Sequence, residues 1–229
     1  MELDGLTGKV YKITDWVMTV AIANLFWFLF NLPIVYFSIA MLLVDNSNEW
    51  IALLILIVFF APFVFFPSTT AMFAIIRNRI MNIEENKNLF RSFISHYKAN
   101  YVRSMLGGLI LCASWVILAV DYYFFTEHVS QLFSYIFIIF AFFLLVCTLH
   151  FFSVTVHMHS GLLVALKNAI LITLGNPLLT LGIGLLSGLI IYGSFHITTF
   201  LIPFFMGSII AYASYLGFFK FFSKVQSLQ

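Results

Sequence analysis

The chain has 229 residues, of which 62% are hydrophobic and only 9% are charged, with a formal net charge of +2. Soluble domains carry about 25% charged residues, so this chain lacks the polar side chains needed to cover a folded surface in water. The composition therefore excludes an ordinary soluble protein and predicts a protein that folds in lipid.

Six apolar segments follow one another along the chain, and each reaches the ~20 residues that a helix needs to cross the hydrocarbon core. A helix is expected in each, because backbone polar groups in lipid must be satisfied within their own segment. We expect an all-α, polytopic transmembrane helix bundle that forms a single membrane domain over residues 1–229. The predicted spans are 16–44, 50–76, 101–125, 131–156, 169–192 and 197–222.

Prolines and short connections affect four of these spans. The first contains Pro33 and is long enough to tilt or kink. In the second, Pro67 frees a backbone carbonyl that the following hydroxyls can satisfy, which predicts a kink near the inner interface; alternatively, a broken helix there presents backbone groups to a ligand. The fifth and sixth are barely separated, so a re-entrant pair is the alternative to two full crossings.

The basic residues all lie on one side of the membrane if each of the six segments crosses it. With the N-terminus in the cytoplasm, the inner segments contain all eleven Lys and Arg residues. The outer loops contain no basic residue and four acidic ones, Asp45, Glu49, Asp121 and Glu127. Cytoplasmic loops are enriched in Lys and Arg. We therefore predict that both termini are cytoplasmic.

A cytoplasmic amphipathic helix is predicted over about 86–100, between the second and third spans. Aromatic and aliphatic side chains fall on one helical face and basic side chains mostly on the other. Such a helix either anchors the chain at anionic headgroups or docks a partner. The candidate lipid- or partner-docking residues are Arg91, Lys98 and Arg103. A Lys-Asn lead-in recurs before the fifth span, which suggests three related helical hairpins.

Three stretches carry a resemblance to a known family: NLFWFLFNLP at 24–33, PSTTAMFAIIRN at 67–78 and LFRSFISHYKANYVRS at 89–104. Together they resemble the YesL-like family of bacterial integral membrane proteins. The residues that match its motifs are Asn24, Trp27, Pro33, Pro67, Thr70, Ala71, Phe73, Phe90, Phe93, Lys98, Asn100, Arg103 and Ser104. Tyr97 and Tyr101 stand where the family commonly has Phe.

The resemblance implies a multi-pass protein of the bacterial plasma membrane. The family is a domain of unknown function that is often linked with loci for oligosaccharide and polysaccharide use, and it has no catalytic residues to transfer. It therefore implies an accessory or scaffold subunit in carbohydrate uptake or utilisation. The partners expected are the lipid bilayer and either a carbohydrate transport complex or further copies of the chain.

Polar side chains within the apolar segments are further candidates. In hydrocarbon they must bond to another helix or to water, so they either hold helices together or line a polar cavity. These candidates are Asn24, Asn31, Ser68, Thr69, Thr70, His150 and Asn176. Small residues that permit close helix packing also recur at helical spacing. They are Ser104, Gly108 and Cys112 in the third span and Gly184 and Gly188 in the fifth.

Familiar catalytic and energy-coupling patterns are missing from the sequence. The spans have no charged residue near their middle, whereas ion-coupled pumps usually do. The chain also lacks the phosphate-binding, metalloprotease and serine-hydrolase motifs, and its histidines lack metal-ligand spacing. We expect no enzyme, metal, cofactor or nucleic-acid partner. A passive channel or facilitator for a small polar solute is the alternative function, and a membrane enzyme acting on lipid or glycan ranks third.

Overall fold

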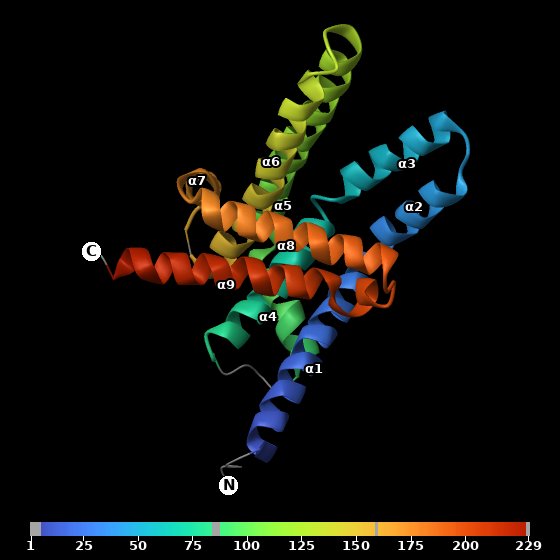
Figure 1. The fold of residues 1–229 in the computed structure, drawn as a ribbon. Helices are drawn as coiled ribbons and strands as arrows, with labels where there is room; N and C mark the ends of the chain where they lie inside the picture. Colours follow the sequence, from blue (N-terminus) through green and yellow to red (C-terminus); the bar gives the residue numbers. More distant parts are fainter. Residues whose placement is uncertain (1–5, 84–87, 159, 228–229) are drawn as a thin grey trace.

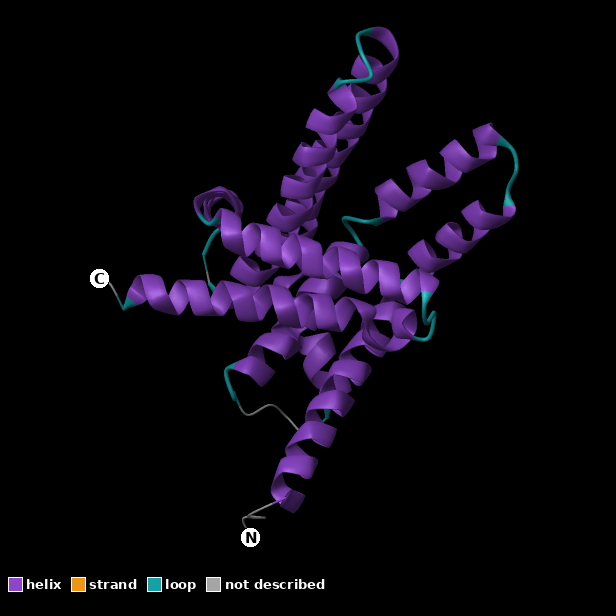
Figure 2. Cartoon of the chain, in the orientation of Figure 1, coloured by secondary structure: helices purple, strands orange, loops and turns teal. Residues whose placement is uncertain are grey.

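The computed structural model describes residues 6–83, 88–158 and 160–227, and it contains helices and no strands in these residues (Figures 1 and 2). This confirms the predicted all-α fold. The helices are α1 (Leu6–Phe30), α2 (Leu32–Leu43), α3 (Ser47–Phe60), α4 (Phe65–Ile80), α5 (Leu89–His128), α6 (Phe133–His157), α7 (Leu162–Gly175), α8 (Pro177–His196), the π-helix η1 (Ile202–Met206) and α9 (Gly207–Gln226).

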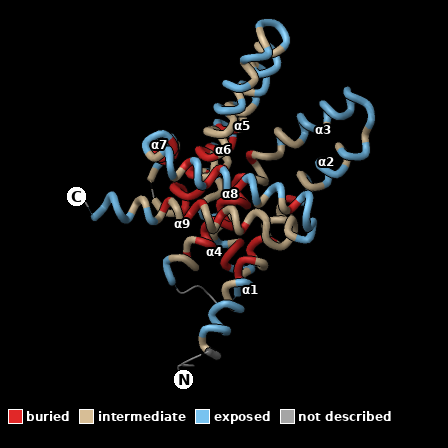
Figure 3. Tube along the Cα trace, viewed as in Figure 1, coloured by how far each residue is buried: buried red, intermediate tan, exposed pale blue. Residues whose placement is uncertain are grey.

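Helix α4 is the centre of the bundle. Twelve of its sixteen residues are buried, and α1, α5, α6 and α9 all pack against it. Figure 3 shows the buried residues gathered around α4, while the outer ends of the α2–α3 and α5–α6 hairpins are exposed. The core therefore forms around a short helix that contains several hydroxyl and amide side chains, and these must find partners on the surrounding helices.

Five helical segments in the described part of the chain are long and apolar enough to cross a membrane, and a bent pair brings the number to six. The bent pair is α3 with α4, whose axes differ by 51°. The two shorter apolar helices are α2 and α7. The structure thus confirms a polytopic helical bundle, with the predicted six spans as its upper count.

The predicted first span, 16–44, is divided in the structure. Helix α1 ends at Phe30, and α2 begins at Leu32 and pairs with α3 as a hairpin (Figure 1). The division follows from Pro33, which cannot continue α1 because it has no N–H and its ring obstructs the preceding turn, but which fits the first turn of a new helix. The apolar segment that can cross a membrane is therefore Gly8–Phe30.

The bend in the second predicted span lies earlier than expected. The break between α3 and α4 falls at residues 61–64 and contains Pro62. Pro67 instead lies in the first turn of α4, where its missing N–H removes no intrahelical hydrogen bond. The predicted kink at Pro67 is corrected accordingly.

The third span and the amphipathic segment form one helix. α5 has 40 residues, a length of about 60 Å at 1.5 Å per residue. The Asn88 side chain accepts a hydrogen bond from the Arg91 backbone N–H at its start, and no proline interrupts the helix after it. The predicted separate interfacial helix over 86–100 is thus the first part of α5, except for 86 and 87, which lie outside the described residues.

The fifth predicted span is also divided. Helix α7 ends at Gly175, and α8 begins at Pro177 after the single residue Asn176. The segments that can cross a membrane in this half are α6, α8 and Ile202–Gln226. α8 and α9 pack against each other and run in opposite directions (Figure 1).

The ends of the helices fall into two groups. In Figure 1 the N-terminal end of α1 and the C-terminal ends of α4 and α9 lie toward the bottom and left. The α2–α3 turn, the α5–α6 turn and the end of α8 lie toward the top and right. The basic last turn of α4 thus lies on the same side as the N-terminal end of α1, and the acidic residues of the α2–α3 turn lie on the other side.

Candidate functional site

Two pairs of polar side chains join the end of α1, and the residue that follows it, to α4. The Asn31 side-chain amide donates to the Ser68 hydroxyl oxygen at 2.8 Å, and the Trp27 indole N–H donates to the Thr69 hydroxyl oxygen at 2.9 Å. Ser68 in turn donates to the Val64 carbonyl at 2.7 Å. Its hydroxyl therefore both accepts between helices and satisfies a backbone carbonyl beside the α3–α4 break.

A third hydroxyl of α4 bonds toward α5. The Ser104 hydroxyl donates to the Thr70 hydroxyl oxygen at 2.8 Å, and both side chains are completely buried. Thr70 itself donates to the carbonyl of Phe66 at 2.9 Å. The consecutive residues from Ser68 to Thr70 thus hold α4 against two neighbours. Residues of all three stretches that carry the family resemblance meet here.

Asn24 joins α1 to the last span. Its side-chain amide donates to the Ile202 carbonyl at 3.0 Å, and its side-chain oxygen accepts from the Ser208 backbone N–H at 2.9 Å. Ile202 is the first residue of the π-helix Ile202–Met206 and Ser208 follows its end, so both groups lie where the hydrogen-bond ladder of an α-helix is interrupted. Asn24, which is fully buried, satisfies groups that the π-helix frees.

Two other predicted polar residues lie apart from this cluster. Asn176 is the N-cap of α8, where its side-chain oxygen accepts from the Leu179 backbone N–H at 3.2 Å. His150 lies on the inner face of α6 with 0% of its surface exposed. Neither of its ring nitrogens has a hydrogen-bond partner in the described part of the chain. The structure therefore brings Asn31 together with the α4 hydroxyls, places Asn24 at a separate junction of α1 with the last span, and leaves Asn176 and His150 apart from both.

The unpartnered His150 ring leads to a stability prediction. We expect His150→Leu to raise the free energy of unfolding by about 1 kcal/mol, because burying polar nitrogens without partners is unfavourable and an apolar side chain of similar size removes that cost. Thermal unfolding in detergent micelles measures the change, with the exposed His128→Leu as the control. A loss of stability in His150→Leu alone would mean that the ring has an essential polar partner.

The C-terminal end of α6 is held by two arginines. Arg77, from α4, donates to the Val156 carbonyl. Arg103, from α5, donates to the carbonyls of Thr155, Met158 at 3.0 Å and Ser160 at 2.8 Å. The last carbonyls of a helix have no intrahelical donor and form the negative end of its dipole. Two guanidinium groups from neighbouring helices therefore cap α6.

The three predicted docking residues are placed differently from one another. Arg91 and Lys98 are exposed on the N-terminal part of α5. Arg103 is only partly exposed and is engaged with the end of α6. The exposed basic pair is thus Arg91 and Lys98, while Arg103 takes part in the packing of the bundle.

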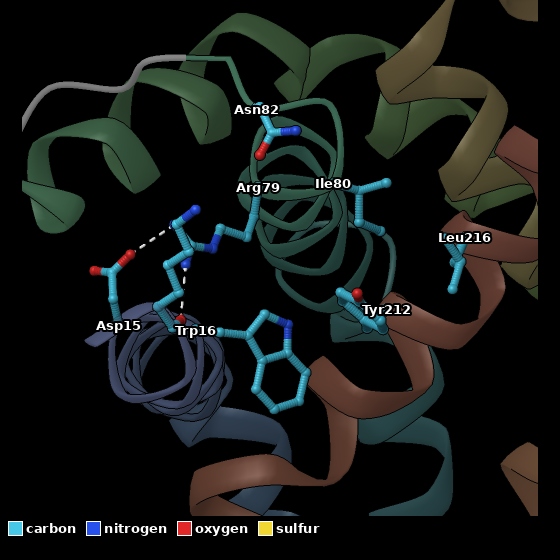
Figure 4. Close-up of a pocket in the computed structure, with 8 residues that line it drawn as sticks. Asp15, Trp16, Arg79, Ile80, Asn82, Tyr212 and Leu216 are labelled. Atoms are coloured by element: carbon cyan, nitrogen blue, oxygen red, sulfur yellow. Dashed lines mark hydrogen bonds and ion pairs between the residues drawn. The ribbon is translucent and has the colours of Figure 1, made fainter. Parts of the chain in front are cut away.

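A pocket of about 440 Å³, which no sequence pattern predicted, lies between α1, α4 and α9 (Figure 4). An ion pair of 2.6 Å between Arg79 Nη1 and Asp15 Oδ2 lies at its edge. Lys12, Trp16 and Tyr212 also line it. The sequence contained a signal for this ion pair. Asp15 lies near the start of the first predicted span and Arg79 just after the second, and such residues can meet when two consecutive helices pack side by side.

Comparison with known proteins places the chain among uncharacterised relatives. Residues 20–122 match the family described as "Protein of unknown function, DUF624". The "Uncharacterized protein YteU" of Bacillus subtilis (strain 168) is 27% identical over 121 residues, which cover 53% of this chain and 43% of that protein. The chain thus matches less than half the length of this relative, and no solved structure matches it. The match over 20–122, which covers the C-terminal part of α1, all of α2, α3 and α4, and α5 as far as residue 122, confirms the predicted resemblance to the YesL-like family, which is DUF624.

Proposed function

We propose that this membrane protein is an accessory or scaffold subunit of a carbohydrate transport system, with no catalytic or pore activity of its own. The observation that carries the proposal is the pairing of the polar side chains in its core. Asn24, Asn31 and Thr70 bond to neighbouring helices at 2.8–3.0 Å, which is how polar residues join helices in a membrane bundle. The resemblance to the YesL-like family supports the link with carbohydrate.

The proposed location is the bacterial plasma membrane, with both termini in the cytoplasm. The separation of all eleven basic residues from the acidic outer loops supports this orientation. The arrangement of the helices also supports it, because the N-terminal end of α1 and the C-terminal end of α9 lie at the same side of the bundle as the basic end of α4 (Figure 1).

The docking surface proposed for the transport partner is the exposed basic face of α5 around Arg91 and Lys98. Neither side chain has a hydrogen bond or ion pair within the described chain. The opposite face of the same segment is anchored, since Phe93 is fully buried against Phe26 and Phe30. A rigid helix with a fixed basic face fits an acidic cytoplasmic surface on the partner.

The double variant Arg91→Glu/Lys98→Glu is expected to lose the transport partner. Like charges brought together at an interface cost several kcal/mol, so recovery of the partner should fall by about tenfold or more. The measurement is quantitative mass spectrometry of sugar-transport proteins that co-purify with the tagged chain from gently solubilised membranes.

The matched control reverses two charges at the α2–α3 turn, Asp45→Lys/Glu49→Lys, and should leave recovery of the partner unchanged. Both double variants should insert in the membrane and melt at the wild-type temperature, because all four side chains are exposed. Undiminished co-purification of Arg91→Glu/Lys98→Glu would refute this docking surface. Solute flux through liposomes that contain only this chain would instead favour the channel.

A further inference from the structure

The pocket between α1, α4 and α9 has more positive charge than its own contacts neutralise. Arg79 is held at its edge by Asp15, at 2.6 Å, and by the carbonyl of Lys12, to which it donates at 3.4 Å (Figure 4). The Lys12 side chain is a second cation in the lining. Two cations therefore face one carboxylate, which leaves a net charge of +1.

Trp16 adds a hydrogen-bond donor without an acceptor. Its indole N–H is buried and makes no hydrogen bond in the described part of the chain. In Figure 4 the indole extends from α1 toward Ile80 and Tyr212, and the Tyr212 ring packs edge-on against it with centroids 5.4 Å apart. Because a buried N–H without an acceptor is unfavourable, a small rotation of the indole that turns this N–H into the pocket would let it meet an acceptor from outside the chain.

We propose that this pocket binds the phosphate group of an anionic phospholipid headgroup. Phosphate oxygens accept charge-assisted hydrogen bonds from guanidinium and ammonium groups, and they also accept from an indole N–H. The volume of about 440 Å³ lies within the usual range of small-molecule sites. Asp15 keeps Arg79 at the edge of the pocket and has a second carboxylate oxygen that can accept from a hydroxyl group of the headgroup.

The position of the pocket favours a lipid headgroup over free phosphate as the ligand. It lies where α1 and α9, which both belong to segments that can cross a membrane, meet the basic end of α4. Trp and Tyr are the aromatic residues enriched at headgroup level. Val10 and Ile13 are 59% and 63% exposed on either side of Lys12, so apolar surface is available to acyl chains next to the cation.

The test measures thermal unfolding of the purified chain in a neutral detergent during titration with dioctanoyl phosphatidylglycerol. Wild-type protein should be stabilised in a saturable way. Lys12→Gln and Trp16→Phe should each weaken the apparent affinity by about tenfold, because each removes one donor to the phosphate. Lys9→Gln is the matched control: it removes the same charge one turn away, outside the pocket lining, and should bind like wild type.

Two further ligands separate the possible sources. Dioctanoyl phosphatidylcholine, with no net charge, should stabilise much less, and equal stabilisation would overturn the proposal. Inorganic phosphate alone should have little effect; the full effect, with the same dependence on Lys12 and Trp16, would assign the pocket to free phosphate and overturn the lipid source. Unchanged phosphatidylglycerol affinity in Lys12→Gln, whose exposed side chain is not needed for folding, would also overturn it.

Discussion

Arg103→Met is expected to lower the free energy of unfolding by about 2–4 kcal/mol, since a hydrogen bond from a charged donor contributes ~1.5–3 kcal/mol and several are lost together. Methionine keeps most of the apolar length of the side chain but donates no hydrogen bond. The carbonyls of Thr155, Met158 and Ser160 would lose their Arg103 donor. Arg77 would remain as a guanidinium at that end of α6.

The measurement is chemical or thermal unfolding in detergent micelles, with Arg91→Met as the control. Arg91 is on the same helix but exposed, and its replacement should change stability by less than about 0.5 kcal/mol. Arg103→Lys should fall between the two, because an ammonium group keeps the charge but cannot bond several carbonyls in the fixed geometry of a guanidinium. Equal effects of Arg103→Met and Arg91→Met would show that the cap contributes nothing.

Gly107→Ala is expected to destabilise the bundle by about 1–3 kcal/mol through overpacking. A Cβ atom at Gly107 would lie 2.1 Å from Cζ and 2.7 Å from Cε2 of the Phe151 ring. That ring is fully buried and packs against Phe152, so moving it away would disturb the packing of the core. The steric effect must also exceed the ~1 kcal/mol by which alanine favours a helix over glycine.

Gly188→Ala is the matched control for this prediction. Gly188 is also inside a helix, but apart from its chain neighbours and the nearby backbone of its own helix no atom lies within 4 Å of the position of its Cβ, so alanine there should leave stability unchanged or improve it. Phe151→Leu should restore part of the stability when it is combined with Gly107→Ala, because it removes the clashing ring atoms. A Gly107→Ala protein as stable as wild type would show that α5 and α6 are packed more loosely than in the structure.

The helices themselves follow from local pattern. Apolar length predicts α6 to within two residues at each end: the predicted span is 131–156 and the helix is Phe133–His157. Asn24 and Asn31 were predicted from the sequence as polar side chains that bond to another helix or line a cavity, and both do bond to other helices. These features depend on residues within one segment, so a sequence pattern contains the information needed.

The partners of polar groups could not be predicted in the same way. The amphipathic pattern placed Arg103 on the exposed basic face of its helix. In the structure its side chain bonds to the end of α6, and this contact depends on how α5 and α6 pack, which no local pattern contains. A spacing of four favoured Gly108 as a packing residue, whereas its neighbour Gly107 has the closer contact. The pocket combines residues from three helices far apart in the chain.

The bond between Asn24 and the π-helix has a consequence for the order of biogenesis. Its two backbone partners are 178 and 184 residues away, so they leave the ribosome roughly 10–40 s after Asn24 does, at 5–20 residues per second. During that interval the newly inserted first helix carries an unsatisfied amide in the lipid or at the translocon. Closure of the bundle by its final segment is therefore a late step, and a nascent chain truncated before residue 202 should be a preferred substrate for membrane quality-control proteases.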